Sequence, residues 1–439
     1  MAEIVSEAKG VTKAMIQKTL SYRYIIYLVV ALAYFFVYFH RTSAAVMAPE
    51  LTKAFNIAPT ALGLFGSMYF YAYALGQLPA GILADRWGAR KTMALFVFIA
   101  GIGAIIFGMA GTFSTALVGR FLVGFGVGFV YVPAMRILAD WFKKNEFATY
   151  SGLLLAVGNI GSLASAAPLV ALMAAIGWRN SMVSVGVISM VIAILAYLFI
   201  RNKPHEVGGA SIPEIEGTVV AGSTRPSLSI GQALAIISRN YNFWTISVLF
   251  FILYGTIMGF QGLWAGPYLM NVYGMDKAAA GKVLSLIPLG MIFGCPLSGI
   301  ISDRILKSRK KVVFGGTLIY LLTWIPLIWM TSTMSPAFLK VLFFVYGFFG
   351  GFFVVMYANL KENVDLQIQG TATGYLNVFV FVGGAVFQQV MAAIIAKYPT
   401  TAAQLIPATA FKSAFLFCFV ALIVGLVVYA TQKEKSALS

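Results

Sequence analysis

Long apolar runs separated by short polar breaks fill most of the chain. Each run is about 20 to 28 residues long, which is enough for an α-helix to cross the ~30 Å hydrocarbon core of a membrane. The runs cover residues 24–46, 61–84, 92–111, 116–137, 148–172, 180–200, 243–266, 279–302, 311–331, 337–359, 370–397 and 409–431. This pattern predicts an all-α integral membrane protein with twelve transmembrane helices.

One longer polar stretch separates the first six runs from the last six. Most of the 31 Lys and Arg residues fall on the side of the membrane that holds this stretch and both termini, and basic loops stay in the cytoplasm. We therefore predict a cytoplasmic N-terminal segment (1–22), an N-terminal six-helix half (23–200), a cytoplasmic loop between the halves (201–241), a C-terminal six-helix half (242–431) and a cytoplasmic tail (432–439).

Composition narrows the class of protein. Hydrophobic residues make up 60% of the chain and charged residues 10%, whereas soluble domains carry about a quarter charged residues. A soluble enzyme, a disordered protein and a disulfide scaffold are excluded. The net charge of +17 lies in short loops, so it orients the chain in a lipid bilayer and predicts no nucleic-acid partner. Cys295 and Cys418 lie in apolar runs without metal-ligand spacing, so no metal or other cofactor is expected.

A short motif occurs twice, at the same place in each half. The first copy lies between the second and third runs and contains Gly81, Asp85, Arg86, Gly88, Arg90 and Lys91. The second copy lies between the eighth and ninth runs, where it keeps Gly299, Asp303 and Arg304 and has Leu306 in place of the second glycine. Two halves with one repeated loop are typical of a duplicated transporter.

With these motifs the chain resembles the major facilitator superfamily over essentially its whole length. The first motif copy meets the family's cytoplasmic signature in full. A second family motif appears as Arg120 followed by Gly124, Gly126 and Gly128, which we interpret as a closely packed helix face. The resemblance implies a multi-pass protein of a bacterial inner membrane, not an enzyme, with both termini cytoplasmic. It also implies alternating access between two halves, and we expect a functional monomer.

The repeated motif is also predicted to act as a conformational latch, formed by Gly81, Asp85, Arg86, Gly88, Arg90, Lys91, Asp303 and Arg304. Gly81 and Gly88 would let two helices approach closely at a tight turn. Asp85, with Arg86 and Arg90 nearby, would join helices of one half to the facing half and favour the outward-facing state. The alternative is that the basic residues only fix the topology.

Ionisable residues inside membrane spans are costly and usually functional. The predicted spans hold Arg41, Arg120 and His40, and every Asp and Glu lies in a loop, at a span end or in a tail. A positive charge without a counterion in a central cavity predicts an anionic substrate. Each of the three residues also has another interpretation. Arg41 could snorkel to the outer interface instead of binding substrate, and Arg120 could cap backbone carbonyls of the first span. His40 is either a proton carrier or a packed histidine.

Several anion-transporting branches of the family, among them the organophosphate and organic-anion transporters, carry a substrate-binding arginine at a place similar to Arg41. Their basic partner on the seventh span is missing here, since that span reads Leu253 to Trp264 without Lys or Arg. A single cation favours a monocarboxylate, or the carboxylate end of an amino acid or peptide, over a sugar phosphate. Polar and aromatic residues predicted to shape the rest of the cavity are Tyr71, Tyr131, Tyr254, Gln261, Trp264 and Asn377.

The sequence thus predicts a secondary active or facilitative transporter, for instance a symporter, that moves a small organic anion or zwitterion by alternating access. A proton or another ion is the possible coupling partner. Two alternatives stay open: a proton-coupled multidrug or sugar-phosphate transporter of the same fold, and a membrane sensor that binds a ligand without transport. An exporter of cationic drugs would need a carboxylate within the membrane to bind the cation, and the predicted spans hold none. A sensor would be expected to have a longer cytoplasmic domain than the nine residues after Ala430.

Overall fold

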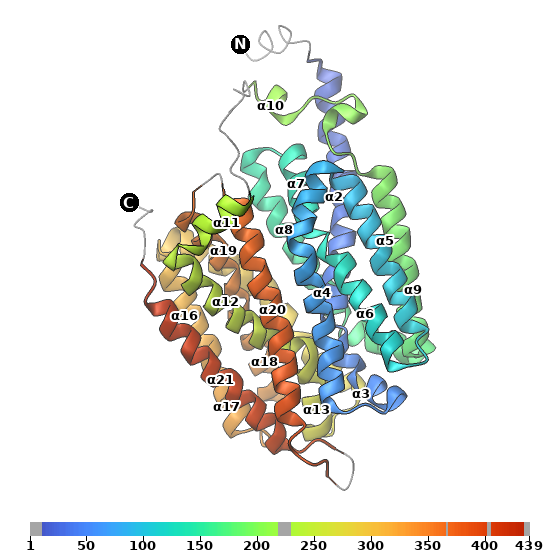
Figure 1. The fold of residues 1–439 in the computed structure, drawn as a ribbon, viewed down its shortest axis with the longest axis vertical. Coiled ribbons are helices and arrows are strands. Elements are labelled where there is room, and N and C mark those ends of the chain that lie inside the picture. Colours follow the sequence, from blue (N-terminus) through green and yellow to red (C-terminus); the bar gives the residue numbers. More distant parts are fainter. Residues whose placement is uncertain (1–10, 218–229, 366–367, 402–404, 434–439) are drawn as a thin grey trace.

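The computed structural model describes residues 11–217, 230–365, 368–401 and 405–433. Every regular element in these ranges is helical (Figure 1). Ten helices are long and apolar enough to cross a membrane: 13–42, 89–108, 113–141, 167–199, 241–273, 277–305, 309–329, 336–363, 369–395 and 408–430. Helices α4 (Pro59–Arg86) and α8 (Lys144–Ala164) occupy the places of the second and fifth predicted spans. The helical membrane fold is confirmed, and the count of twelve spans stays a prediction.

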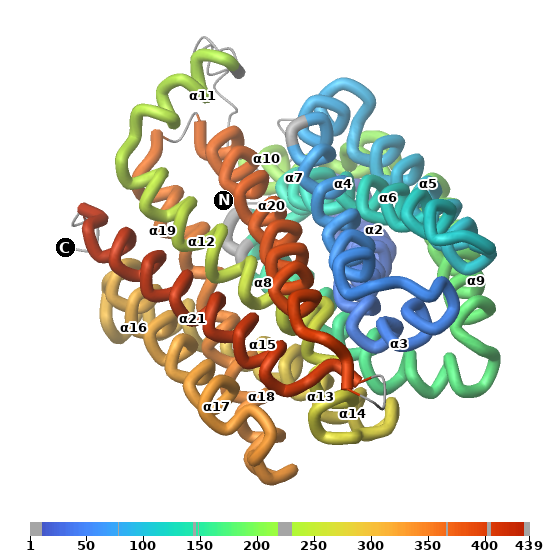
Figure 2. Tube along the Cα trace, turned by 60° about the horizontal axis from the view of Figure 1, so that its bottom comes forward, coloured from blue at the N-terminus to red at the C-terminus, as the bar shows by residue number. Residues whose placement is uncertain are grey.

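The helices form two groups that pack side by side (Figures 1 and 2). Besides α4 and α8, the first group contains α2 (Lys13–Thr42), α3 (Ala44–Phe55), α5 (Ala89–Gly108), α6 (Phe113–Gly128), α7 (Tyr131–Trp141) and α9 (Ala167–Phe199). The second group contains α12 (Tyr241–Gly259), the π-helical turn η2 (Phe260–Trp264), α13 (Ala265–Tyr273), α14 (Lys277–Leu284), α15 (Leu286–Ile300), η3 (Ile301–Ile305), α16 (Arg309–Leu322), α17 (Trp324–Trp329), α18 (Pro336–Gly350), η4 (Gly351–Val354), α19 (Val355–Asn363), α20 (Gln369–Ile395) and α21 (Ala408–Ala430).

Small residues bring the helices into backbone contact. A Cβ atom added at Gly124 would lie 2.3 Å from the carbonyl oxygen of Tyr69, and one at Gly126 would lie 2.4 Å from that of Phe96. The glycine run of α6 therefore packs directly against α4 and α5, as predicted for a close-packing helix face. Between the two groups, a Cβ at Gly63 on α4 would lie 2.3 Å from the Cβ of Ala392 on α20.

Two helix breaks lie in the first group. α2 ends at Thr42 and α3 begins at Ala44, with a turn at Ser43 between them. α8 ends at Ala164, inside the predicted fifth span, and the chain turns at Ser165 and Ala166 before α9. α9 itself contains the boundary predicted between residues 172 and 180, where Gly177 has a φ of 78° that breaks the helical geometry.

The start of α2, the end of α21 and the segment between the halves lie at one end of the molecule, which we call the terminal end; α3, α13 and α14 lie at the opposite, far end (Figures 1 and 2). The connecting segment contains η1 (Pro204–Val207), α10 (Ile212–Ile215) and α11 (Ile230–Ser238). It packs on α2, because the Thr19 hydroxyl donates to the carbonyl of Ala210 at 2.8 Å. The boundary predicted at residue 22 thus falls inside α2. Residues 1–10 and 434–439 of the predicted tails lie outside the described ranges.

Candidate substrate cavity

A cavity of about 120 Å³ lies between the two helix groups. It is lined by α2, α4, α7 and α8 from the first half and by α12, η4, α19 and α20 from the second. Its lining is mostly aromatic, with three aliphatic residues, one cation and one amide: Tyr34, Tyr38, Arg41, Tyr73, Tyr131, Leu155, Tyr254, Phe353, Val354, Tyr357, Asn377, Val380 and Phe381.

Arg41 reaches this cavity from the last turn of α2 and is 3% exposed. Its guanidinium carbon lies 4.3 Å from the ring centroid of Tyr38 and 5.3 Å from those of Tyr73 and Phe381, distances that allow cation–π attraction. The Nε atom has no hydrogen-bond partner. No carboxylate belongs to the described lining of the cavity, so aromatic rings are the main surroundings of this charge.

A chain of hydrogen bonds fixes the polar groups at the cavity. The Tyr357 hydroxyl donates to Oδ1 of Asn377 at 2.8 Å, and Nδ2 of Asn377 donates to Oε1 of Gln77 at 3.1 Å. Gln77 in turn donates to the carbonyl of Gly128 at 3.2 Å. Because Asn377 lies on α20 and Gln77 on α4, the chain joins the two halves directly beside the cavity.

Four of the residues predicted for the substrate site line the cavity: Arg41, Tyr131, Tyr254 and Asn377. The sequence analysis missed most of the tyrosines. Tyr34, Tyr38 and Arg41 follow each other at four and three residues along α2, so they share one helix face. That spacing was readable, but an aromatic stripe in an apolar span is hard to distinguish from ordinary packing. Tyr73 and Tyr357 come from other helices, and only the fold brings them to Arg41.

Arg120 and His40 lie beside the cavity but do not line it. Arg120 is 2% exposed, and its Nη1 donates to the backbone carbonyl of His40 at 2.8 Å. This contact is the capping of first-span carbonyls that the sequence analysis named as the alternative to substrate binding. The His40 ring is fully buried and contacts the rings of Phe36 and Phe39. Neither of its ring nitrogens has a hydrogen-bond partner.

Three further predicted residues lie in the contact between the halves or toward the far end. The Tyr71 hydroxyl donates to Oε1 of Gln389 at 3.1 Å, and Nε1 of Trp264 donates to the carbonyl of Gln388 at 3.2 Å. Gln261 lies in the π-helical turn η2 and lines a different, much smaller cavity. These side chains therefore shape the surroundings of the substrate cavity without lining it.

The motif residues that were predicted to form the latch have other partners in the structure than expected. Asp85 pairs with Arg136 on α7, in its own half, because the ends of α4 and α7 lie together at the terminal end. Arg90 donates through Nε to the carbonyl of Tyr197 at 2.6 Å. Asp85 was expected to bridge to the facing half, but in this structure its ion pair stays within its own half. Arg86 and Lys91 are exposed.

The two glycines of the first motif copy also behave differently. Gly88 has a φ of 86°, and a Cβ there would lie 2.6 Å from Oδ1 of Asn202, so this position needs glycine as predicted. A Cβ at Gly81 would meet nothing within 4 Å, so the close helix contact predicted there is wrong for this structure. In the second copy, Asp303 pairs with Arg309, which also bonds to Glu362 at 2.9 Å, and Arg304 is exposed.

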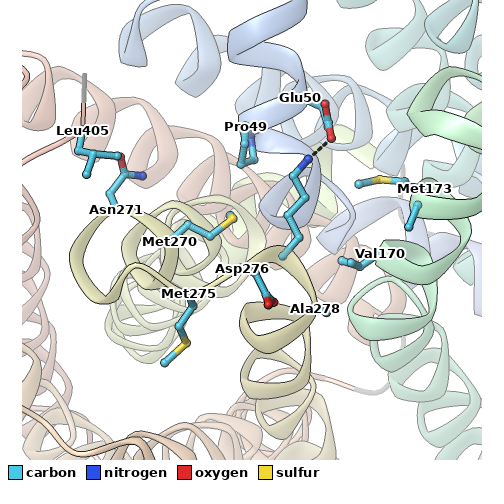
Figure 3. A pocket seen from close by; sticks show the side chains of 12 residues that line it. Pro49, Glu50, Val170, Met173, Met270, Asn271, Met275, Asp276, Ala278 and Leu405 are labelled. Atoms are coloured by element: carbon cyan, nitrogen blue, oxygen red, sulfur yellow. Dashed lines mark hydrogen bonds and ion pairs between the residues drawn. The ribbon is translucent and has the colours of Figure 1, made fainter. Parts of the chain in front are cut away.

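A second, larger cavity of about 680 Å³ opens at the far end between the halves (Figure 3). Glu50 on α3 pairs there with Lys277 on α14, as the dashed line in Figure 3 marks. Close by, a Cβ at Gly266 on α13 would lie 2.0 Å from the carbonyl oxygen of Ala45. The halves are thus in tight contact at the far end, whereas Gly81 and Gly374 near the terminal end have open space around them.

Comparisons with known proteins agree with this architecture. The chain is 25% identical to a probable sulfoacetate transporter of Cupriavidus necator, over 83% of this chain and 85% of that protein. It is 26% identical to a probable hexose phosphate transport protein of Chlamydia trachomatis, over 81% of each. A crystal structure of a bacterial homolog of the human lysosomal transporter Spinster, inward-facing and unoccupied, has a TM-score of 0.71 at 19% identity and covers 93% of this chain and 96% of that one.

The family model described as Major Facilitator Superfamily matches residues 30–388. This range begins in α2 and ends in α20, so it covers most of both halves and every residue that lines the substrate cavity. The protein is therefore a multi-pass membrane protein rather than an enzyme, and the chain belongs to the major facilitator superfamily.

Proposed function

We propose that this protein transports a small organic anion across the inner membrane by alternating access, with Arg41 as the residue that binds the anionic group. One observation carries the proposal: a buried guanidinium lies in a cavity between the halves, and no carboxylate belongs to the described lining. An isolated buried charge is expensive to keep. An anionic substrate would supply the missing counterion and would bind through the paired N–H groups of the guanidinium.

The size and the lining of the cavity restrict the substrate further. The cavity volume of about 120 Å³ is well below the roughly 300–1,000 Å³ of sites for drug-sized ligands, which argues against a multidrug transporter. The aromatic rings can cover the carbon skeleton of a small acid, and the Asn377 amide and the tyrosine hydroxyls can bond to its hydroxyl groups. Sulfoacetate and hexose phosphates, named for the two relatives, are both small organic anions, which supports this substrate class.

A single basic residue in the cavity favours a carboxylate or sulfonate over a phosphate ester. Among the described lining residues Arg41 is the one Lys or Arg, and a dianionic phosphate usually meets more than one donor cation. The similarity to a probable hexose phosphate transport protein supports phosphate esters as the second candidate class. A zwitterion also stays possible, with its ammonium group held by the tyrosine rings.

The proposal is tested by binding and by flux. Purified protein is screened by thermal unfolding against sulfoacetate, a hexuronate, a hexose phosphate and the matching neutral hexose, because a ligand of the folded state raises the unfolding midpoint. We expect acids to stabilise the wild type and the neutral hexose to have no effect. Arg41→Gln should lose the response. Stabilisation by the neutral sugar equal to that by the acid would contradict the anion site.

Uptake of the stabilising acid into proteoliposomes then separates a transporter from a sensor of the same fold. A transporter accumulates or exchanges the labelled acid, and Arg41→Gln abolishes the flux. Specific binding without any flux, in a preparation whose lipid and orientation are controlled, would favour the sensor and overturn the transport proposal while leaving the anion site in place.

A further inference from the structure

A small cavity with four polar side chains lies between the halves, separate from the substrate cavity. Its volume is about 10 Å³, roughly the space that one water-sized sphere fills. Its oxygen-bearing side chains come from three places: Thr42 at the end of α2, Ser162 and Ser165 at the end of α8, and Gln261 in η2 of the other half. The rest of its lining is apolar.

The oxygens of this cluster outnumber the protons available to them. The Thr42 hydroxyl lies 3.0 Å from the Tyr38 carbonyl, 3.0 Å from the Ser162 hydroxyl and 2.7 Å from the Ser165 hydroxyl. Ser165 also lies 2.8 Å from the Ser162 carbonyl. These four contacts share three hydroxyl protons, since each hydroxyl donates once. At most three of these four contacts can therefore be full two-centre hydrogen bonds, and hydroxyl lone pairs stay available in the cluster.

Gln261 adds a further acceptor to the same cavity. The side chain is 5% exposed and its Oε1 has no hydrogen-bond partner. A buried carbonyl oxygen without a donor is costly, and Gln261 lines the same cavity as the three hydroxyls of the other half. The cavity thus collects oxygen atoms from both halves, and besides the three hydroxyls the Gln261 amide is the one donor group among its described lining side chains.

Helix breaks next to the cavity strengthen this interpretation. α2 breaks at Ser43 and α8 breaks at Ser165, while η2 is a π-helical turn inserted between α12 and α13. In transporters of several folds, interrupted helices near the middle of the membrane coordinate monovalent cations through backbone and side-chain oxygens. Three interruptions meet at this one small cavity.

We infer that Thr42, Ser162, Ser165 and Gln261 form a binding site for a small monovalent cation of the Na⁺ class. The ligands are neutral oxygens, which can coordinate a hard cation of low charge, and no carboxylate that a Ca²⁺ or Mg²⁺ site would use belongs to the described lining. Occupancy would tie α2 and α8 of one half to η2 of the other. Arg41 precedes Thr42 directly, but its side chain lines the substrate cavity rather than this one.

The site is tested on the purified full-length protein, without any substrate. Thermal unfolding is measured in NaCl, LiCl, KCl and N-methyl-D-glucamine chloride at equal chloride concentration, so that ionic strength and the anion stay constant. We expect a saturable rise of the unfolding midpoint with Na⁺ over N-methyl-D-glucamine. Thr42→Val and Gln261→Leu should remove this rise. Ser189→Ala changes a similarly buried hydroxyl on α9, which donates to Val185, and should keep it.

Gln261→Glu gives a second readout that a merely structural role would not produce. The substitution keeps the oxygen and adds a negative charge, so half-saturation should occur at about tenfold lower Na⁺, the change that ~1.4 kcal/mol of added attraction produces. The inference is overturned if the midpoint is the same in all four salts, which would leave a bound water as the occupant. It is equally overturned if the Na⁺ response persists in both Thr42→Val and Gln261→Leu. Neither outcome touches the anion site, which is tested separately.

Discussion

Arg41 is the residue on which the proposed function rests, and its surroundings make a sharp prediction. Arg41→Lys should retain less than a tenth of the wild-type affinity for the transported acid, because lysine cannot reproduce the planar fork that binds two oxygens. Arg41→Gln should lose on the order of 2–5 kcal/mol of binding free energy. Both are measured as the ligand concentration that half-saturates the thermal shift.

Arg120→Lys is the matched control for this prediction. Arg120 is as deeply buried as Arg41, but it donates to the backbone carbonyl of His40 and does not line the cavity. A lysine can still donate to that carbonyl, so the affinity for the acid should stay close to that of the wild type. Near-normal affinity in Arg41→Gln, together with a loss in Arg120→Lys, would reverse the roles that we assign to the two arginines.

The residue scale also shows where sequence reasoning ends. A lone arginine in an apolar span stands out against its neighbours, so Arg41 could be singled out from composition alone. Tyr34 and Tyr38 on the same helix face could not, since aromatic residues are frequent in membrane cores. Gln261 was noticed as a costly buried amide, but its place in a second cavity depends on how η2 packs against α2 and α8.

At the scale of helix pairs, close backbone packing between α2 and α8 sets a stability test. A Cβ at Gly161 would lie 2.1 Å from the carbonyl oxygen of Phe35, whereas one at Gly152 on the same helix would meet nothing within 4 Å. Gly161→Ala should therefore destabilise the protein by about 1–3 kcal/mol through overpacking. Gly152→Ala should be neutral or slightly stabilising, because alanine favours the helix.

The close contact between α2 and α8 is tested by measuring the thermal unfolding of both variants under identical detergent and salt conditions. A lower midpoint for Gly161→Ala alone supports the α2–α8 contact. Equal midpoints for the two variants would show that α2 and α8 are farther apart than in this structure, which would also weaken the cation site, since Thr42 and Ser162 belong to the same pair of helices.

The segment between the halves contains a pH-sensitive helix start. The Ser211 N–H donates to Oε2 of Glu214 at 2.7 Å, and His205 lies 3.4 Å from the same oxygen. The hydrogen bonds that Glu214 accepts from the backbone and the side chain of Ser211 lower the pKa of Glu214 below its ordinary value, and His205 adds a smaller contribution. A lowered pKa in the folded state means that the stabilisation is present above the ordinary glutamate pKa and is lost as the pH falls through the lowered one.

Hydrogen exchange of residues 201–217 should therefore be slow at neutral pH and should accelerate in this segment as the pH drops below about 4, after correction for intrinsic exchange rates. Glu214→Gln should show the faster exchange already at pH 7, because the amide is a weaker capping group. Glu216→Gln, two residues along, is the control. Unchanged protection in Glu214→Gln would exclude this capping contact as a determinant of the segment's order.

At the scale of the whole molecule, the duplicated halves and their connection could be predicted from hydropathy and the repeated motif, because both depend on local sequence. The partners of the motif could not. Asp85 pairs with Arg136 within its own half, a contact that depends on the packing of α4 against α7. The ion pair that does bridge the halves, Glu50 with Lys277, joins two residues that sequence analysis had assigned only to loops or span ends.

This bridging pair makes the last prediction, which concerns the balance between the two faces of the transporter. Glu50 and Lys277 are partly exposed, so their attraction contributes about 1 kcal/mol or less, enough to change a conformational equilibrium about fivefold. Lys277→Glu places two like charges across the far-end contact and should open it. The double variant Glu50→Lys with Lys277→Glu restores an opposite pair and should close it again.

In a background without Cys295 and Cys418, a cysteine at Met173 in the far-end cavity reports the opening through labelling by a membrane-impermeant thiol reagent. Faster labelling in the single variant, reversed in the double one, is the expected result. Equal labelling in all three proteins would show that the apolar and backbone contacts around Gly266, rather than this ion pair, hold the far end closed.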